Sequence, residues 1–245
     1  MGILDIIKES MKSPVIKQQE LFQQTLESIP LAPVGRDGKF HNRNFASRDL
    51  DGFKCKSLTK SSSLNKLVTF IAFDTETTGI SLTDNEVIEV SAIRFEFFQP
   101  VEMFTTLLCP KKPIPVESIK VHHITDDMVM GAPKFWEIIP SFDAFIGKAP
   151  MIAHNASFDV MHLYASGLDS MAKKAVYDTC DISRKLNKQL QNHKLATACA
   201  RYGIYFNGAH RSSADALACG ELFIYQLMQM HGCKTFQELQ QKVIG

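Results

Sequence analysis

Apolar residues in the middle of the chain follow two different periods, which predicts an alternation of strands and helices. Residues 67–72 form a short apolar run rich in β-branched and aromatic side chains, typical of a buried strand. Residues 87–95 and 102–108 have the same texture, and a tight turn near Gln99 and Pro100 would join them. Because short connections link the three runs, we expect an antiparallel meander.

Helical periodicity appears after the meander. From residue 133 to residue 148 the apolar positions recur every three or four residues, which predicts a helix packed on the sheet. Residues 151–153 then predict a short buried strand that leads directly into a helix. A further strand and two helices are expected at residues 176–178, 181–190 and 193–202. The last strong element is a long helix that begins after His210, with Ser212 and Ser213 as candidate N-terminal caps.

The first 65 residues differ in texture from the rest. The apolar residues between Pro14 and Pro30 have roughly helical spacing, which predicts one short amphipathic helix. Residues 30–63 form an irregular connector in which basic residues alternate with phenylalanines: Arg36, Lys39, Arg43, Arg48, Lys54, Lys56, Lys60, Phe40, Phe45 and Phe53. This mixture fits a nucleic-acid contact, and equally a solvated tail docked on the main domain. We therefore expect an extension over 1–65, a main domain over 66–232 and a tail with a short helix over 233–245.

Composition narrows the classes of function only slightly. The chain has 245 residues and a formal net charge of +1, so any nucleic-acid hypothesis depends on a local site rather than on bulk charge. The 6 cysteines are scattered without a Cys-x-x-Cys pair, which favours reduced thiols in a cytoplasmic protein over a zinc ribbon or a disulfide framework. No apolar run approaches the roughly 20 residues of a membrane span, so we expect no membrane partner.

The first predicted strand carries two acidic residues at its end. Asp74 and Glu76 are two positions apart, so on an extended backbone both side chains project from one face and Thr75 from the other. Like charges held that close repel one another unless a cation lies between them, which indicates a site for an oxygen-seeking metal. The alternative is a solvated strand end followed by a Thr-Thr-Gly turn. Since Asp-x-Glu is common, the metal hypothesis depends on acids elsewhere in the chain.

Two further acids are expected at the same edge of the sheet. Asp159 lies in the first turns of the helix that follows the strand at 151–153, and Asp215 lies near the start of the long helix. His210 can meet Asp215 only from the preceding loop, because five residues on a helix correspond to a rotation of roughly 140°. Each acid alone could stabilise a helix dipole. Together, four carboxylates and a histidine suit two-metal phosphodiester hydrolysis, in which the histidine takes a proton from water.

Three segments resemble, in order and spacing, the motifs of the DEDD exonucleases of the histidine-containing branch: residues 73–79, residues 154–159, and His210 with Asp215. Residues 113–115 and 121–125 look most like those of the proofreading epsilon subunits of bacterial DNA polymerase III. The resemblance covers about residues 66–232. It implies an α/β, ribonuclease H-like fold with a mixed five-stranded sheet flanked by helices. It also implies 3′-to-5′ removal of nucleotides with two divalent cations, Mg²⁺ or Mn²⁺.

The resemblance also implies roles for individual positions. The metal ligands and catalytic residues would be Asp74, which bridges the metals, Glu76 and Asp215 at the tighter site, Asp159 at the second metal, and His210 as general base. The terminal nucleotide would be bound by Thr77, Thr78, Gly79, Phe158, His122 and Ile124. The family's usual His-Gly-Ile appears here with His123 at the glycine position, which questions the backbone conformation and the substrate fit at that point.

The preferred hypothesis is an exonuclease that acts on single-stranded or frayed DNA 3′ ends and releases nucleoside monophosphates. It would be either a proofreading partner of a DNA polymerase or a stand-alone trimming enzyme. An RNA exonuclease of the ribonuclease T or oligoribonuclease type would use the same residues, and a non-catalytic scaffold module of a replication complex is a third alternative. A sliding clamp is suggested as a further partner by five residues that resemble clamp-docking peptides: Gln18, Gln19, Glu20, Leu21 and Phe22.

Overall fold

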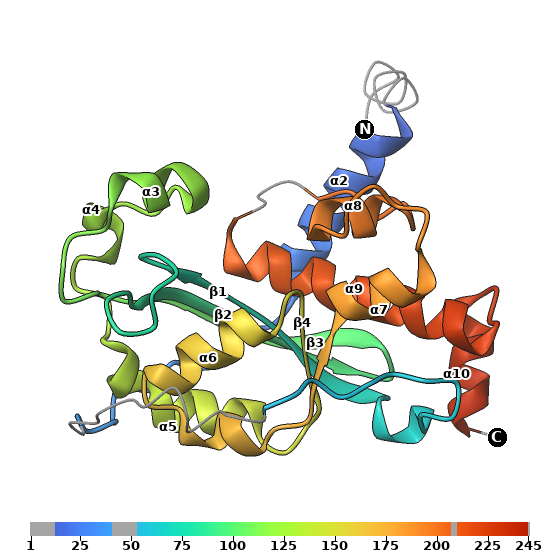
Figure 1. Ribbon diagram of the computed structural model, residues 1–245, viewed down its shortest axis with the longest axis horizontal. Coiled ribbons are helices and arrows are strands. Elements are labelled where there is room, and N and C mark those ends of the chain that lie inside the picture. The colour runs from blue at the N-terminus through green and yellow to red at the C-terminus, as the bar shows by residue number, and fades with distance from the viewer. Residues whose placement is uncertain (1–12, 41–52, 207–209, 245) are drawn as a thin grey trace.

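A five-stranded mixed sheet forms the centre of the molecule (Figure 1). The computed structural model describes residues 13–40, 53–206 and 210–244. The strand order is β3-β2-β1-β4-β5, in which β1, β2 and β3 are antiparallel neighbours while β4 runs parallel to β1 and β5 parallel to β4. The strands are β1 (Thr69–Thr77), β2 (Val87–Glu96), β3 (Gln99–Leu107), β4 (Met151–Ala153) and β5 (Val176–Asp178). The predicted α/β class, meander and mixed five-stranded sheet are confirmed.

Strand β1 extends well beyond its parallel neighbour. β4 pairs with β1 only at Ile71 and Ala72, whereas β2 accompanies β1 as far as Thr77. The sequence predicted a strand that carries Asp74 and Glu76 at its end, and this is confirmed, because β1 continues to Thr77. Because β4 stops early, the last part of β1 is open to side chains from the helix that follows β4.

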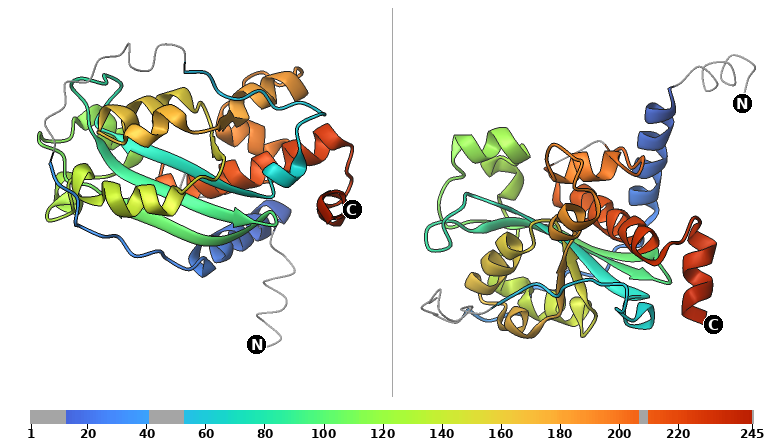
Figure 2. Two further views of the ribbon diagram at one scale, coloured as in Figure 1. Left: turned by 90° about the horizontal axis from the view of Figure 1, so that it is seen from below. Right: turned by 45° about the vertical axis from the view of Figure 1, so that its right-hand side comes forward.

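Helices cover both faces of the sheet, as Figure 2 shows. Helices α5 (Phe135–Ile146) and α6 (Ser157–Ala165) share one apolar cluster with the sheet, and α9 (Ser212–His231) shares the other with α7 (Thr179–Leu186) and α8 (Leu195–Ala200). Gly220 allows α9 to lie directly on the strands, because a Cβ atom there would be 2.4 Å from the Phe95 ring. This close packing fixes the start of α9 relative to β1 and β2.

The turn of the meander is not where the sequence pattern predicted it. Phe97 and Phe98 form the turn, both with left-handed φ angles of 48° and 63°. Pro100 instead lies within β3, which is an edge strand and so tolerates a residue without an N–H group. The Phe98 side chain is buried and contacts Phe236 of α10 (Phe236–Ile244). Two phenylalanines in left-handed conformations are unusual, so the local sequence carried no signal for this turn.

The described parts of the extension pack against both outer strands. Helix α2 (Pro14–Ser28) agrees with the predicted amphipathic helix. The Ala32 N–H then donates to the Met103 carbonyl on β3 at 2.7 Å, and the Lys56 N–H donates to the Val176 carbonyl on β5 at 2.6 Å. Three residues of the predicted basic and aromatic connector lie outside the described residues: Arg43, Phe45 and Arg48.

The remaining helices are short. They are α3 (Val116–His122), α4 (Asp126–Val129) and the 3₁₀ segments η2 (Leu64–Lys66) and η3 (Asp169–Lys173). The predicted helices at 181–190 and 193–202 are observed as α7 and α8, which are shorter. Helix α7 starts earlier because Asp178 caps it, and it ends where Asn187 bonds to the Tyr202 hydroxyl at 2.9 Å. Among the described helices, none combines the length and apolar character that crossing a bilayer requires.

Candidate active site

The end of β1 presents its acids to the face that α9 covers. Asp74 and Glu76 alternate with the buried Thr75 and Thr77, as expected for a strand. The even-numbered positions before them pack with α9, whereas the odd-numbered ones pack with α5 and α6. The two carboxylates therefore project from one face, as the residue spacing predicted.

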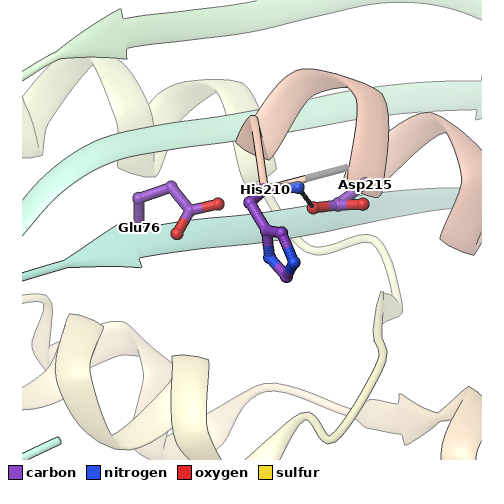
Figure 3. Close-up of side chains that lie close together, drawn as sticks. All are labelled: Glu76, His210 and Asp215. Atoms are coloured by element: carbon purple, nitrogen blue, oxygen red, sulfur yellow. Dashed lines mark hydrogen bonds between the residues drawn. The ribbon is translucent and has the colours of Figure 1, made fainter. Parts of the chain in front are cut away.

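Glu76, His210 and Asp215 come together at the start of α9 (Figure 3). One potential ligand atom from each of the three side chains lies within 4.8 Å of the other two. His210 lies on the turn before α9, in a left-handed conformation with a φ of 68°. Its backbone N–H donates to Asp215 Oδ2 at 2.8 Å. The five-residue spacing of His210 and Asp215 predicted this arrangement, with His210 on the loop and Asp215 in the first turn of the helix.

Asp159 reaches β1 from the opposite side, at the N-terminal turn of α6. Its Oδ1 atom accepts hydrogen bonds from the Thr75 backbone N–H at 3.0 Å and from Thr75 Oγ1 at 2.6 Å. Thr75 lies between Asp74 and Glu76 in the strand, so Asp159 is attached to the same short stretch of β1. The early end of β4 makes this contact possible.

Burial and the repulsion of neighbouring carboxylates both disfavour a charge on Asp74. Burial raises the pKa of Asp74 well above its ordinary value, and the carboxylates of Asp159, Asp215 and Glu76 raise it further. Among the described residues, none donates a hydrogen bond to the side-chain carboxylate of Asp74 or Glu76. Asp74 thus stands at the centre of the acidic group, with its negative charge uncompensated by the chain.

The pKa values of the other three acids are also raised, to different degrees. Burial, followed by the charge of Asp215, raises the pKa of Glu76 to about 8. Burial raises the pKa of Asp159 to about 7 although its hydrogen bonds from Thr75 act in the opposite direction. Burial also raises the pKa of Asp215 to about 6, and the His210 N–H partly offsets this. Converging carboxylates with few donors are the ligand set of hard divalent cations, so these residues fit such ions.

The predicted nucleotide-binding residues after β1 stabilise a turn. Thr77 Oγ1 donates to the Gly79 carbonyl at 2.7 Å, and Thr78 Oγ1 accepts from the Glu86 N–H at 2.9 Å. A side chain at Gly79 would have its Cβ 2.7 Å from the Asn85 side chain, so glycine is required there. Both threonines are buried in the free protein, and a hydroxyl would have to exchange partners to contact a nucleotide.

The end of α3 shows the backbone conformation of His123. His123 adopts a left-handed conformation with a φ of 60° and ends α3, so it keeps a backbone shape that glycine favours. His122 is buried, its Nδ1 accepts the Ile124 N–H at 3.0 Å, and burial lowers its pKa. Ile124 is buried with Ile88. Thr125 is the N-cap residue of α4 and forms no side-chain capping bond.

Phe158 is the remaining predicted contact. It lies on the first turn of α6, half-buried, beside Asp159, and its ring centroid is 4.5 Å from that of His162. The structure thus gathers the acids and His210 on the end of β1, while Phe158 flanks them on α6. His122 comes from α3 and lies near enough to the start of α9 for the charges of His210 and Arg211 to act on it.

The sequence pattern missed one ion pair beside this site. Glu89 lies directly opposite Glu76 in the β1–β2 register and bonds to Arg211, the residue after His210. The expectation that Ser212 or Ser213 caps α9 is wrong. The N-cap residue is Arg211 without a side-chain capping bond, and the Ser212 N–H donates to Glu89 instead. The available signal was Glu89 itself, a charged residue between the apolar residues Ile88 and Val90.

The suggested clamp peptide lies on helix α2. Phe22 is only 2% exposed and contacts the Phe206 ring at 5.4 Å, whereas Leu21 is 56% exposed. Only Leu21 of this apolar pair faces solvent. Docking of both side chains on a clamp would require Phe22 to leave its own core.

Carboxylates and a histidine at the end of the central strand of a mixed sheet are the residue types that metal-dependent phosphodiester hydrolysis uses. The sequence model described as Exonuclease matches residues 71–223, a range that includes every predicted catalytic residue. The chain therefore belongs to the exonuclease family, and it is a 3′-to-5′ exonuclease.

Similar proteins agree with this assignment. The DNA polymerase III subunit epsilon of Treponema pallidum (strain Nichols) is 38% identical over 163 residues, which are 64% of this chain and 75% of the relative. The DNA polymerase III PolC-type protein of Halalkalibacterium halodurans is 38% identical over 157 residues, or 62% of this chain. The match spans only 11% of that longer relative.

Solved structures share the fold. Exonuclease X in complex with 5′ overhanging duplex DNA superposes with a TM-score of 0.56 at 22% identity, covering 71% of this chain and 99% of the other. An exonuclease I structure superposes with a TM-score of 0.57 at 16% identity, covering 71% of this chain and 42% of the other. At these identities the similarity shows the ribonuclease H-like architecture of the exonucleases.

Proposed function

We propose that this exonuclease removes mismatched or unpaired nucleotides from DNA 3′ ends as the proofreading activity of a replicative polymerase. The observation that carries the proposal is the group of four repelling carboxylates with His210 at the end of β1. The names of the epsilon and PolC-type relatives support DNA as the substrate and a polymerase as the partner. A cytoplasmic place of action follows from that partnership.

The acids would hold two divalent cations, Mg²⁺ or Mn²⁺. We assign Asp74 to both ions, Glu76 and Asp215 to one, and Asp159 to the other. When bound, such ions neutralise the carboxylates and polarise the scissile phosphodiester. The chemistry of the donor set supports this assignment, because all four are carboxylates with raised pKa values and the carboxylate oxygens are the ligands that these ions prefer.

His210 would act as the general base. Its ring is exposed while its backbone N–H is held by Asp215, so the imidazole can accept a proton from the attacking water without losing its place. Phe158 would stack on the terminal nucleotide, and the Thr77, Thr78 and Gly79 turn would bind its sugar and phosphate. His122 and Ile124 would line the far side of that pocket.

A degradation ladder tests the function and the substrate together. Single-stranded, paired and 3′-mismatched DNA and a matched RNA strand are incubated with Mg²⁺ and then with chelator. We expect metal-dependent release of mononucleotides, fastest from single-stranded and mismatched DNA, and no activity in Asp74→Ala. Activity that survives Asp74→Ala would refute the site. Faster degradation of RNA than of DNA would contradict the proofreading role and favour the alternative of an RNA exonuclease.

Clamp binding is a separate proposal on the exposed side of α2. Leu21→Ala removes the one solvent-facing apolar side chain of the pair and leaves the buried Phe22 in place. We expect weaker binding to the sliding clamp of the same organism, measured by surface plasmon resonance, with Val15→Ala as an exposed control on the same helix. Equal affinity of Leu21→Ala and the wild type would end this proposal.

A further inference from the structure

Glu89 is a charged residue near the start of strand β2, between the buried residues Ile88 and Val90. Its side chain is only 3% exposed, and the register places it opposite Glu76, on the same face of the sheet. A carboxylate in such a place is costly unless cationic and polar donors satisfy both of its oxygens. A buried carboxylate at this position of β2 therefore requires hydrogen-bond donors for both of its oxygens.

Arg211 and the start of α9 provide these donors. Arg211 Nη2 donates to Glu89 Oε1 at 2.7 Å, and Arg211 Nε lies 3.2 Å from Oε1 and 3.3 Å from Oε2. The backbone N–H of Ser212 donates to Oε2 at 2.9 Å. Glu89 thus binds both the guanidinium and the first free N–H of the helix, and it replaces the missing side-chain cap.

The same contacts surround His210. On one side, Glu89 ties Arg211 and Ser212 to β2. On the other, the His210 N–H donates to Asp215 Oδ2 at 2.8 Å, and the Asp215 N–H donates to the Arg211 carbonyl at 3.1 Å. His210 itself has a left-handed backbone, a conformation that persists only when its surroundings enforce it.

We propose that Arg211 and Glu89 are positioning residues that hold the His210 imidazole beside Glu76 and Asp215. Arg211 has a second effect. By occupying both oxygens of Glu89, it removes this fifth carboxylate from the set available to cations beside Glu76. This inference rests on the proposed role of His210 as general base, and it adds the two residues that place it.

Steady-state kinetics of Arg211→Met on single-stranded DNA with Mg²⁺ test the proposal. We expect kcat to fall by about 10²-fold with KM within about threefold, since the base is displaced while the strand still binds. Arg211→Lys keeps the charge and should recover at least about tenfold of the loss. Circular dichroism establishes that each variant is folded. If Arg211→Met does not fold, Glu89→Gln, which keeps the side-chain shape, takes its place with the same expected loss.

Arg94→Met is the matched control. Arg94 pairs with Glu102 at 3.5 Å between β2 and β3, away from His210, and its side chain is 24% exposed. We expect this variant to lower the melting temperature and leave kcat within about threefold. The proposal is overturned if folded Arg211→Met keeps its kcat, or if Arg94→Met loses as much. An Asp74→Ala variant that remains active would instead refute the proposed function, so the two failures are distinguishable.

Discussion

Two polar clusters lie at the same edge of the sheet, where the parallel strands end, and they are built in opposite ways. At the end of β5, the carboxylate of Asp178 accepts the backbone N–H groups of Asn155, Ala156 and Cys180 at 2.8–3.1 Å. At the end of β1, no described residue donates to the side-chain carboxylate of Asp74 or Glu76. Asp178 therefore accepts hydrogen bonds from three donors, whereas the carboxylates of Asp74 and Glu76 accept none and repel one another.

The histidines show the same contrast. His154 donates from Nε2 to the His193 carbonyl at 2.8 Å, and its Nδ1 bonds to the Thr179 hydroxyl at 2.8 Å. His210 is held by its backbone and leaves its ring exposed. Both histidines lie in segments that match exonuclease motifs. Side chains whose polar atoms are all hydrogen-bonded, such as His154, stabilise this edge of the sheet. Side chains without such partners, such as His210, remain available for chemistry.

The largest expected effect comes from Asp74→Asn. We expect kcat to fall by about four orders of magnitude or more, as for the loss of a central catalytic group. In chelator the same variant should melt at a higher temperature than the wild type, because one of four repelling charges is gone. Activity assays and thermal melts check both. A variant that is inactive and also less stable would show that Asp74 stabilises the fold. It would contradict the distinction between the Asp178 cluster and the Asp74 cluster.

His210→Ala tests the available histidine against the satisfied one. We expect a loss of about 10²–10⁴ in kcat with little change in melting temperature, because the ring is exposed and no described residue forms a hydrogen bond with it. His154→Ala should behave in the reverse way and destabilise the protein by about 1–3 kcal/mol. Urea denaturation and single-strand degradation rates, measured on both variants, compare the two. Equal losses of activity and stability in both would contradict the distinction.

Asp178→Ala measures what the satisfied cluster contributes. Three backbone N–H groups lose their acceptor, so we expect the free energy of unfolding to fall by about 2 kcal/mol. Activity of the folded protein should stay within about tenfold. Urea denaturation provides the measurement. A stability equal to that of the wild type would mean that water replaces the carboxylate without cost.

The raised pKa values predict an unusual pH dependence. Glu76, with a pKa of about 8, and Asp159, with a pKa of about 7, bind protons in the folded state that the unfolded chain has already released. Stability of the metal-free protein is therefore greatest below about pH 4 for these groups and is lost as pH rises through 7 and 8. Melts in chelator should show a lower melting temperature at pH 8 than at pH 5.5, and Mg²⁺ should restore it. A rise in stability with pH in chelator would disprove the repulsion.

The smallest expected effect belongs to His123→Gly. Glycine adopts the left-handed backbone without strain, so we expect an increase in the free energy of unfolding of about 0.5–1 kcal/mol. Denaturant titration can resolve a change of this size. A decrease would show that the His123 side chain makes a compensating contact that glycine cannot replace.

Periodicity and spacing were sufficient for most of the architecture. The alternation of Asp74 with Thr75 and the distance from His210 to Asp215 predicted a shared face and a loop-to-helix contact, because both follow from backbone geometry alone. Features that depend on distant partners were not predictable. Ser212 looked like a cap, yet the capping oxygen comes from Glu89 on another strand. The left-handed Phe97–Phe98 turn likewise depends on packing against α10 rather than on local preference.

Anomalous diffraction from crystals grown with Mn²⁺ and a deoxynucleoside monophosphate tests the central claim most directly. If the repelling acids are a divalent-cation site, anomalous peaks should lie within coordination distance of Asp74, one shared with Glu76 and Asp215 and one near Asp159. Soaking with chelator should remove both peaks. Nucleotide bound at the end of β1 with no peak at Asp74, or peaks only at other acids, would contradict the account.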